Sequence, residues 1–166
     1  MSDWPAGRHL ASLYDGLYLS LAQAAPRASL DGVVVRLHES SRAFGALALE
    51  LRRNDENVAP DALVTSVIEN SLDHDETGSL TLYALSMVIG PRLLVSLRDY
   101  LEDESDGSRR VVLSHGSDVV IGEIRAVGVT MAREVPRDDA PWATAARAIV
   151  DTFDEAGMAE SLGQQH

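Results

Sequence analysis

Oxygen-bearing side chains recur at alternate positions of one short stretch, DHDETGSLT, in the middle of the chain. Asp73, Asp75 and Thr77 take its first, third and fifth positions, and Thr81 takes its ninth. Calcium prefers oxygen ligands presented at alternate positions of a tight loop, and Gly78 at the sixth position supplies the sharp turn. The pattern therefore predicts a weak calcium site on this stretch.

The stretch resembles the first nine positions of the calcium loop of EF-hand proteins. It departs from that family at the twelfth position, where Ala84 replaces the bidentate glutamate. The interpretation that we favour over the calcium site is a polar connector between a helix and a strand, with Gly78 in a left-handed conformation. A helix after Gly78 would favour the calcium hand and a strand would favour the connector, and we expect the strand.

The residues just before this stretch offer a second kind of chemistry. Asn70 and His74 are four residues apart, so they share one face if their helix persists that far. This helix end resembles the N-box of histidine-kinase-type ATPases and related anti-sigma kinases, in which an Asn holds nucleotide-bound magnesium. The resemblance implies an adenine contact from Asp99. Ser66 stands where that family has Glu, and Asp99 is not followed by a Gly-rich run, so the resemblance implies a degenerate nucleotide-binding domain.

A third constellation is Arg110 and His115, which enclose the four residues VVLS. It resembles the Arg-x4-His motif of helical HEPN ribonucleases. The apolar spacer is typical of a strand, and the acidic charge of the chain disfavours RNA. We therefore do not expect a nuclease.

Composition narrows the classes of function. The 166 residues predict one domain, numbered 1–166. The lack of cysteine excludes a disulfide scaffold, a thiolate zinc site and a cysteine nucleophile, and it fits the cytoplasm. The formal net charge of −12 disfavours nucleic-acid binding and suits basic partners or cations. All basic residues are Arg, which indicates a GC-rich, bacterial genome. No window has the roughly 18 uninterrupted apolar residues of a membrane span.

The pattern of apolar residues predicts an α+β fold. Helices are expected in the first part of the chain, because apolar residues there recur every three or four positions. A closing helix is expected at the C-terminal end, where Pro141 suits a first turn. The predicted order is a helical part over 1–74 with three helices (8–25, 30–53 and 60–74), an antiparallel sheet of about four strands over 79–135, and a closing helix over 139–158.

The sheet prediction depends on two stretches. Leu80–Ile89 has apolar residues at both odd and even positions, as a strand covered on both faces would. The following Gly90-Pro91 predicts the turn of a hairpin. A single long helix is the alternative, but a Gly-Pro in its middle would cost about 3–4 kcal/mol. Residues 119–135 are rich in Val, Ile and Gly and predict one or two further strands. Helical spacing through Val120, Ile124, Val127 and Met131 remains an alternative there.

These patterns favour a non-enzymatic, cytoplasmic interaction protein: a regulator, an adaptor or a small acidic chaperone. We expect a protein partner, with a homodimer as one option, and neither nucleic acid nor membrane. The alternatives are a degenerate histidine-kinase-type ATP-binding domain using Asn70, His74 and Asp99, and a weak calcium-binding module at Asp73–Thr81. The sequence predicts no catalytic residue and specifies no cofactor.

Overall fold

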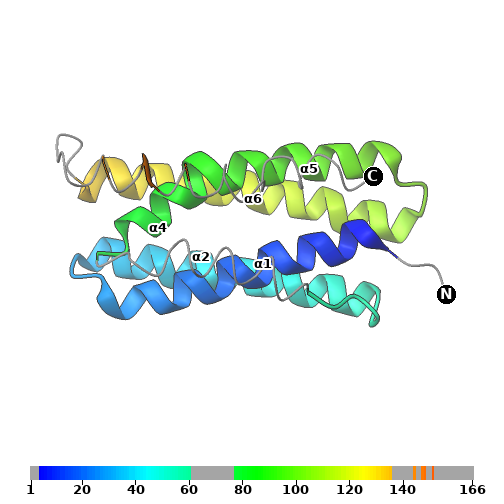
Figure 1. Ribbon diagram of the computed structural model, residues 1–166, viewed down its shortest axis with the longest axis horizontal. Coiled ribbons are helices and arrows are strands. Elements are labelled where there is room, and N and C mark those ends of the chain that lie inside the picture. Colours follow the sequence, from blue (N-terminus) through cyan, green and yellow to red (C-terminus); the bar gives the residue numbers. More distant parts are fainter. Residues whose placement is uncertain (1–3, 61–76, 136–143, 145–146, 149–150, 152–166) are drawn as a thin grey trace.

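The first half of the chain forms an antiparallel pair of long helices. The computed structural model describes residues 4–60, 77–135, 144, 147–148 and 151. Helix α1 (Pro5–Ala24) leads through the short 3-10 turn η1 (Ala25–Arg27) into α2 (Asp31–Asn54), which runs back along it (Figure 1). Both helices lie where their three- and four-residue spacing predicts them.

The second half of the chain forms another antiparallel pair. Helix α4 (Ser79–Ala84), the π-helical segment η2 (Leu85–Ile89) and α5 (Gly90–Asp103) follow one another without a break. Helix α6 (Gly107–Glu134) then returns along α5 (Figure 1). The two pairs pack against each other, and α2 and α6 run antiparallel across the interface, with Arg36 beside Glu123 and Asp55 beside Arg109.

The predicted α+β fold with a four-stranded sheet over 79–135 is wrong. The described residues form helices and contain no strand, and positions 79–103 and 107–134 are helical throughout. Leu80–Ile89 has apolar residues at both odd and even positions because neighbouring helices cover it on most sides. A buried helix and a strand buried on both faces give this same pattern, so the pattern does not distinguish them. In 119–135 the helical alternative is confirmed, since Val120 and Val127 are fully buried.

The Gly90-Pro91 pair does not end the helix, because the turn before it is wider than an α-helical turn. The N–H of Gly90 donates to the carbonyl of Leu85, five residues back, so the chain accommodates Pro91 at the start of α5. A methyl group on Gly90 would overlap that carbonyl oxygen and would lie 2.8 Å from Cγ1 of Ile124 on α6. Glycine at this position therefore permits both the wide turn and the close approach of α6.

The core fills the space between the two helix pairs. The predicted stripe of α1 is buried at Leu10, Leu13, Tyr14, Leu17 and Leu21, whereas Tyr18 is 41% exposed. Small buried side chains on α2, Ser41 and Ala48, allow α1 to approach closely. The Ser41 hydroxyl donates to the Tyr18 carbonyl at 2.9 Å.

Two predicted helices fall mainly outside the described residues. The helix expected over 60–74 cannot be compared beyond residue 60. Of the closing helix expected over 139–158, only Thr144, Arg147, Ala148 and Asp151 are described, and all four are helical and exposed. Their spacing of three, one and three residues places them on one face of a helix.

One described stretch is long and apolar enough to cross a membrane. It is the continuous helical run Ser79–Asp103, and 61% of its most apolar window is buried inside the bundle. A buried core helix of a bundle meets the same criterion, so this run carries no argument for a membrane.

Candidate functional site

Most residues of the predicted calcium and nucleotide sites lie outside the described residues. This holds for Asn70, Asp73, His74 and Asp75, so both sites remain predictions. A helix follows Gly78 directly, and the strand that we expected there is wrong. Gly78 does have the expected left-handed backbone, with φ of 79°.

The described part of the predicted calcium loop is compact. The backbone N–H of Ser79 donates to the Thr77 hydroxyl at 3.3 Å, which closes a short turn before α4. Thr81 already lies inside α4 and is only 1% exposed. The helix that follows Gly78 is the outcome that favours the calcium hand over the connector. An EF-hand loop also has a bidentate acid at its twelfth position, where this chain has Ala84. The calcium site therefore stays a prediction.

Asp99 lies on α5 instead of at the end of a hairpin, and its neighbour Tyr100 points into the bundle. The Tyr100 hydroxyl is 2.7 Å from Nδ1 of His9 on α1, and the two rings meet edge to face. Burial, and secondarily the negative charge of Asp99, raise the pKa of the Tyr100 hydroxyl well above its ordinary value. Tyr100 therefore stays neutral and joins α1 to α5 through a buried polar contact.

Arg110 and His115 lie on different sides of α6. Residues five apart on an α-helix are about 140° apart around its axis. Arg110 donates to the carbonyls of Leu101 and Glu104 at the end of α5, at 2.7 and 2.8 Å. His115 faces α2 instead, with Nδ1 2.6 Å from Glu50. The two side chains of the Arg-x4-His pattern thus hold α6 against two different helices and do not converge on one site.

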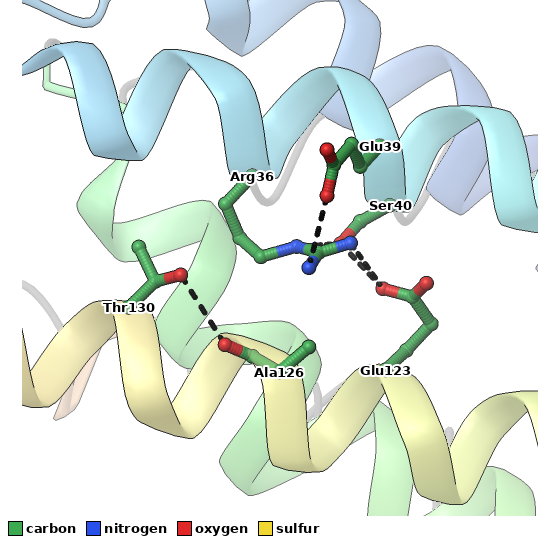
Figure 2. A network of polar contacts seen from close by, with 6 residues as sticks. All are labelled: Arg36, Glu39, Ser40, Glu123, Ala126 and Thr130. Atoms are coloured by element: carbon green, nitrogen blue, oxygen red, sulfur yellow. Dashed lines mark hydrogen bonds and ion pairs between the residues drawn. The ribbon is translucent and has the colours of Figure 1, made fainter.

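The densest polar cluster joins α2 to α6 (Figure 2). The Arg36 guanidinium contacts Glu123 at 3.2 Å, Glu39 at 3.3 Å and the Ser40 hydroxyl at 3.1 Å. The Ser40 hydroxyl in turn donates to Glu123 at 2.6 Å. All three guanidinium nitrogens are engaged and two carboxylates face one cation, so Arg36 is not free to bind a phosphate. The cluster works as a clamp between the helices.

A shallow groove of about 320 Å³ lies beside this clamp. Its walls come from the first turns of α2 and the last turns of α6. Acidic and basic side chains both line it, and the Glu134 carboxylate packs directly over Gly32. Five of its eight lining residues are charged, whereas pockets that hold a small ligand are lined predominantly by hydrophobic and aromatic side chains. Its lining residues are Asp31, Gly32, Val35, Arg36, Glu39, Thr130, Arg133 and Glu134.

The side of α6 that faces away from the bundle is the feature that sequence reasoning missed. We call it the outer face of α6. On it Val111 is 67% exposed, Val129 56% and Ile121 37%. Its signal in the sequence is a spacing of three and four residues, which the strand prediction over 119–135 hid. The face consists of Val111, Ser114, Asp118, Ile121, Gly122, Arg125, Val129 and Ala132, all of which are exposed.

Comparison with known proteins adds no family. The chain matches no family model, and neither a curated protein nor a solved structure is significantly similar to it. Within the described ranges, no group of three or more His, Asp or Glu side chains is arranged to hold a metal ion. The outer face of α6 is the candidate functional surface, because α6 carries three of the nine large apolar side chains that are exposed among the residues described, more than any other helix.

Proposed function

We propose that the protein is a non-enzymatic interaction protein that binds a protein partner through the outer face of α6. The observation that carries this proposal is the exposure of Val111, Ile121 and Val129 on a helix that contributes only four buried residues to the core. A surface helix normally turns its apolar stripe inward and shows water a charged face. Apolar residues that the fold does not bury are typical of interaction sites.

The charge of the chain supports the class of partner. A net charge of −12 disfavours nucleic acid as the partner, so we take the partner to be a protein. A cytoplasmic regulator, adaptor or small acidic chaperone fits this charge and the lack of cysteine. Several of the titratable residues described on the bundle, such as Arg36, Glu123 and His115, serve as contacts between helices.

The test compares two valines of nearly equal exposure on different helices. Val129 on α6 is 56% exposed and Val35 on α2 is 54% exposed. Complexes of the full chain, with itself or with a protein captured from native lysate, are quantified for the wild type, Val129→Glu and Val35→Glu. We expect Val129→Glu to weaken association at least about tenfold, since a buried unpaired carboxylate opposes binding. Val35→Glu should leave it unchanged.

Two results would contradict this proposal. If the wild type forms no complex with itself or with any captured protein, an interaction function has no support. If only Val35→Glu weakens the complex, the interaction belongs to the groove between α2 and α6, which Val35 lines, and not to the outer face of α6. Circular dichroism of both variants checks that the helices remain intact.

The two alternative functions keep their own tests. A degenerate nucleotide site predicts that ATP with magnesium raises the melting temperature, because a ligand stabilises the state that binds it. A calcium site predicts a heat of calcium binding that Asp73→Ala removes. If ATP with magnesium leaves the melting temperature unchanged and calcium gives no heat of binding, both alternatives are eliminated.

A further inference from the structure

We infer that the outer face of α6 binds the same face of a second copy of this chain, antiparallel, about a two-fold axis beside Ile121 and Gly122. This rests on the proposed function and names its partner. An isologous dimer requires one patch that is complementary to itself after a two-fold rotation. The outer face of α6 meets this requirement through the positions of its charges, the sizes of its side chains and the glycine at its centre.

The charges on this face select the antiparallel orientation. Asp118 and Arg125 lie one on either side of Ile121 and Gly122, three residues from the nearer of the two. A two-fold axis between positions 121 and 122 places Asp118 of each copy opposite Arg125 of the other, which gives two ion pairs. A parallel arrangement would place like charges opposite each other. Complementary charges set orientation and register more than affinity.

Neither charge contacts another helix among the residues that the structure describes. Both side chains are exposed. In the part of the chain that the structure describes, Asp118 and Arg125 form no ion pair with each other or with a third residue. Arg36, Arg52 and Arg109, in contrast, each pair with a carboxylate on another helix. The two charges are therefore available to a second copy.

The sizes of the side chains also match across this axis. The rotation places Val111 opposite Ala132 and Val129 opposite Ser114, so a larger side chain meets a smaller one at each end. At the centre, a methyl group added to Gly122 would touch nothing within 4 Å. Glycine there lets two helix backbones approach closely. From Val111 to Ala132 the face is about 32 Å long, at 1.5 Å per residue.

The absence of cysteine gives a direct test of the geometry. Any cysteine introduced is the sole thiol in the chain, so cross-linking under mild oxidation reports its distance from the same residue in the other copy. Gly122→Cys lies at the axis and should cross-link efficiently. Val111→Cys lies about 32 Å from its own symmetry mate and should not. Mixing Val111→Cys with Ala132→Cys should restore cross-linking between the two different chains.

A charge exchange tests the same arrangement without a covalent bond. Asp118→Arg and Arg125→Asp each place two like charges opposite each other, and each should weaken self-association about tenfold. An equimolar mixture of the two variants should form heterodimers, detected by native mass spectrometry, because every pair is then of opposite sign. The chain that carries both substitutions should dimerise like the wild type. Glu102→Arg on α5 and Arg42→Asp on α2, both exposed positions elsewhere, are the matched controls.

The outcomes separate this inference from the proposed function. A wild type that is monomeric at about 100 µM, a concentration at which weak dimers form, overturns the dimer. If such a monomer still captures a heterologous protein that Val129→Glu releases, the proposed function stands and the inference fails. A wild-type dimer that ignores both charge variants uses another surface and also overturns the inference. Cross-linking by Val111→Cys alone would overturn the antiparallel orientation.

Discussion

Helices α1 and α6 are both rich in apolar residues, but they use them in opposite ways. Twelve of the 20 residues of α1 are buried, and its apolar stripe faces α2 and the core. Only four of the 28 residues of α6 are buried, although valine and isoleucine occur all around it. Helix α1 is thus a typical amphipathic core helix, whereas α6 carries more apolar residues than it buries in the core.

The difference shows that an apolar residue on a helix is not by itself a sign of the core. Val127 and Val129 of α6 are two positions apart, yet Val127 is fully buried and Val129 is 56% exposed. The packing of α6 on α2 and α5 decides which valine belongs to the fold. Val129 stays on the surface, where we propose that a partner covers it.

Leu17→Ala should cause the largest loss of stability. Leu17 is fully buried on α1, so its truncation leaves a cavity and should lower the free energy of unfolding by about 3 kcal/mol. Leu49 on α2 is 45% exposed, and Leu49→Ala should change the same quantity by less than about 1 kcal/mol. Urea denaturation with an unchanged m-value provides the measurement. Equal losses for the two leucines would show that the core extends to the outside of α2.

The contrast between α1 and α6 also explains what the sequence could predict. The stripe of α1 repeats every three or four residues and has polar residues between, so the period identifies the helix. Residues 79–135 lack that contrast, because valines and isoleucines occupy both buried and exposed sides. Such residues favour strands in isolation. Packing between helices overrides that preference, and this packing cannot be recognised from the pattern of apolar residues along the chain.

Gly90→Ala and Gly122→Ala should change stability in opposite directions. Gly90 lies against Ile124 on the inner side of α6, and an added methyl group should lower the free energy of unfolding by about 1–3 kcal/mol. Gly122 lies on the outer face, where alanine meets nothing within 4 Å and should raise it by up to about 1 kcal/mol. The measurement is made at low protein concentration, where a dimer dissociates. A loss at Gly122 would show that its backbone is already packed within one chain.

Glu123→Gln should weaken the side of α6 that faces α2. The Glu123 side chain is 13% exposed and Arg36 is 14% exposed, so solvent screens their ion pair only in part. Removing that charge should lower the free energy of unfolding by about 1–2 kcal/mol. Glu39 contacts the same guanidinium but is 61% exposed, and Glu39→Gln should change stability by less than about 0.5 kcal/mol. Equal effects would mean that the clamp acts through charge balance alone.

The candidate surface could be predicted from sequence less well than the helices. Asp118 and Arg125 are seven residues apart, which places them on one face only once a helix is assumed. The strand prediction placed them in different elements. The calcium and nucleotide hypotheses started from ligand-like residue types instead. Residue types suggest chemistry, but the exposure that distinguishes Val129 from Val127 exists only after the helices have packed.

The smallest expected effect concerns the first turns of the two helices. The N-cap residue of α1, Trp4, makes no capping hydrogen bond with its side chain, whereas the Asp106 side chain caps α6. The Asp106 carboxylate accepts from the Arg109 N–H at 3.0 Å and from the Ser108 hydroxyl at 2.7 Å, and these bonds lower its pKa below the ordinary 3.8.

A carboxyl group with a lowered pKa in the folded state stabilises the fold above its unfolded pKa. That contribution is lost as the pH falls through the lower, folded value. Asp106→Ala should therefore lower the melting temperature slightly at neutral pH, and its difference from the wild type should shrink as the pH falls below 3.8. Asp106→Asn keeps an acceptor without a charge and should lie between the two at neutral pH. Thermal unfolding followed by circular dichroism across this pH range provides the measurement. A difference between Asp106→Ala and the wild type that is the same at both ends of the range would show that the ionised carboxylate does not stabilise α6.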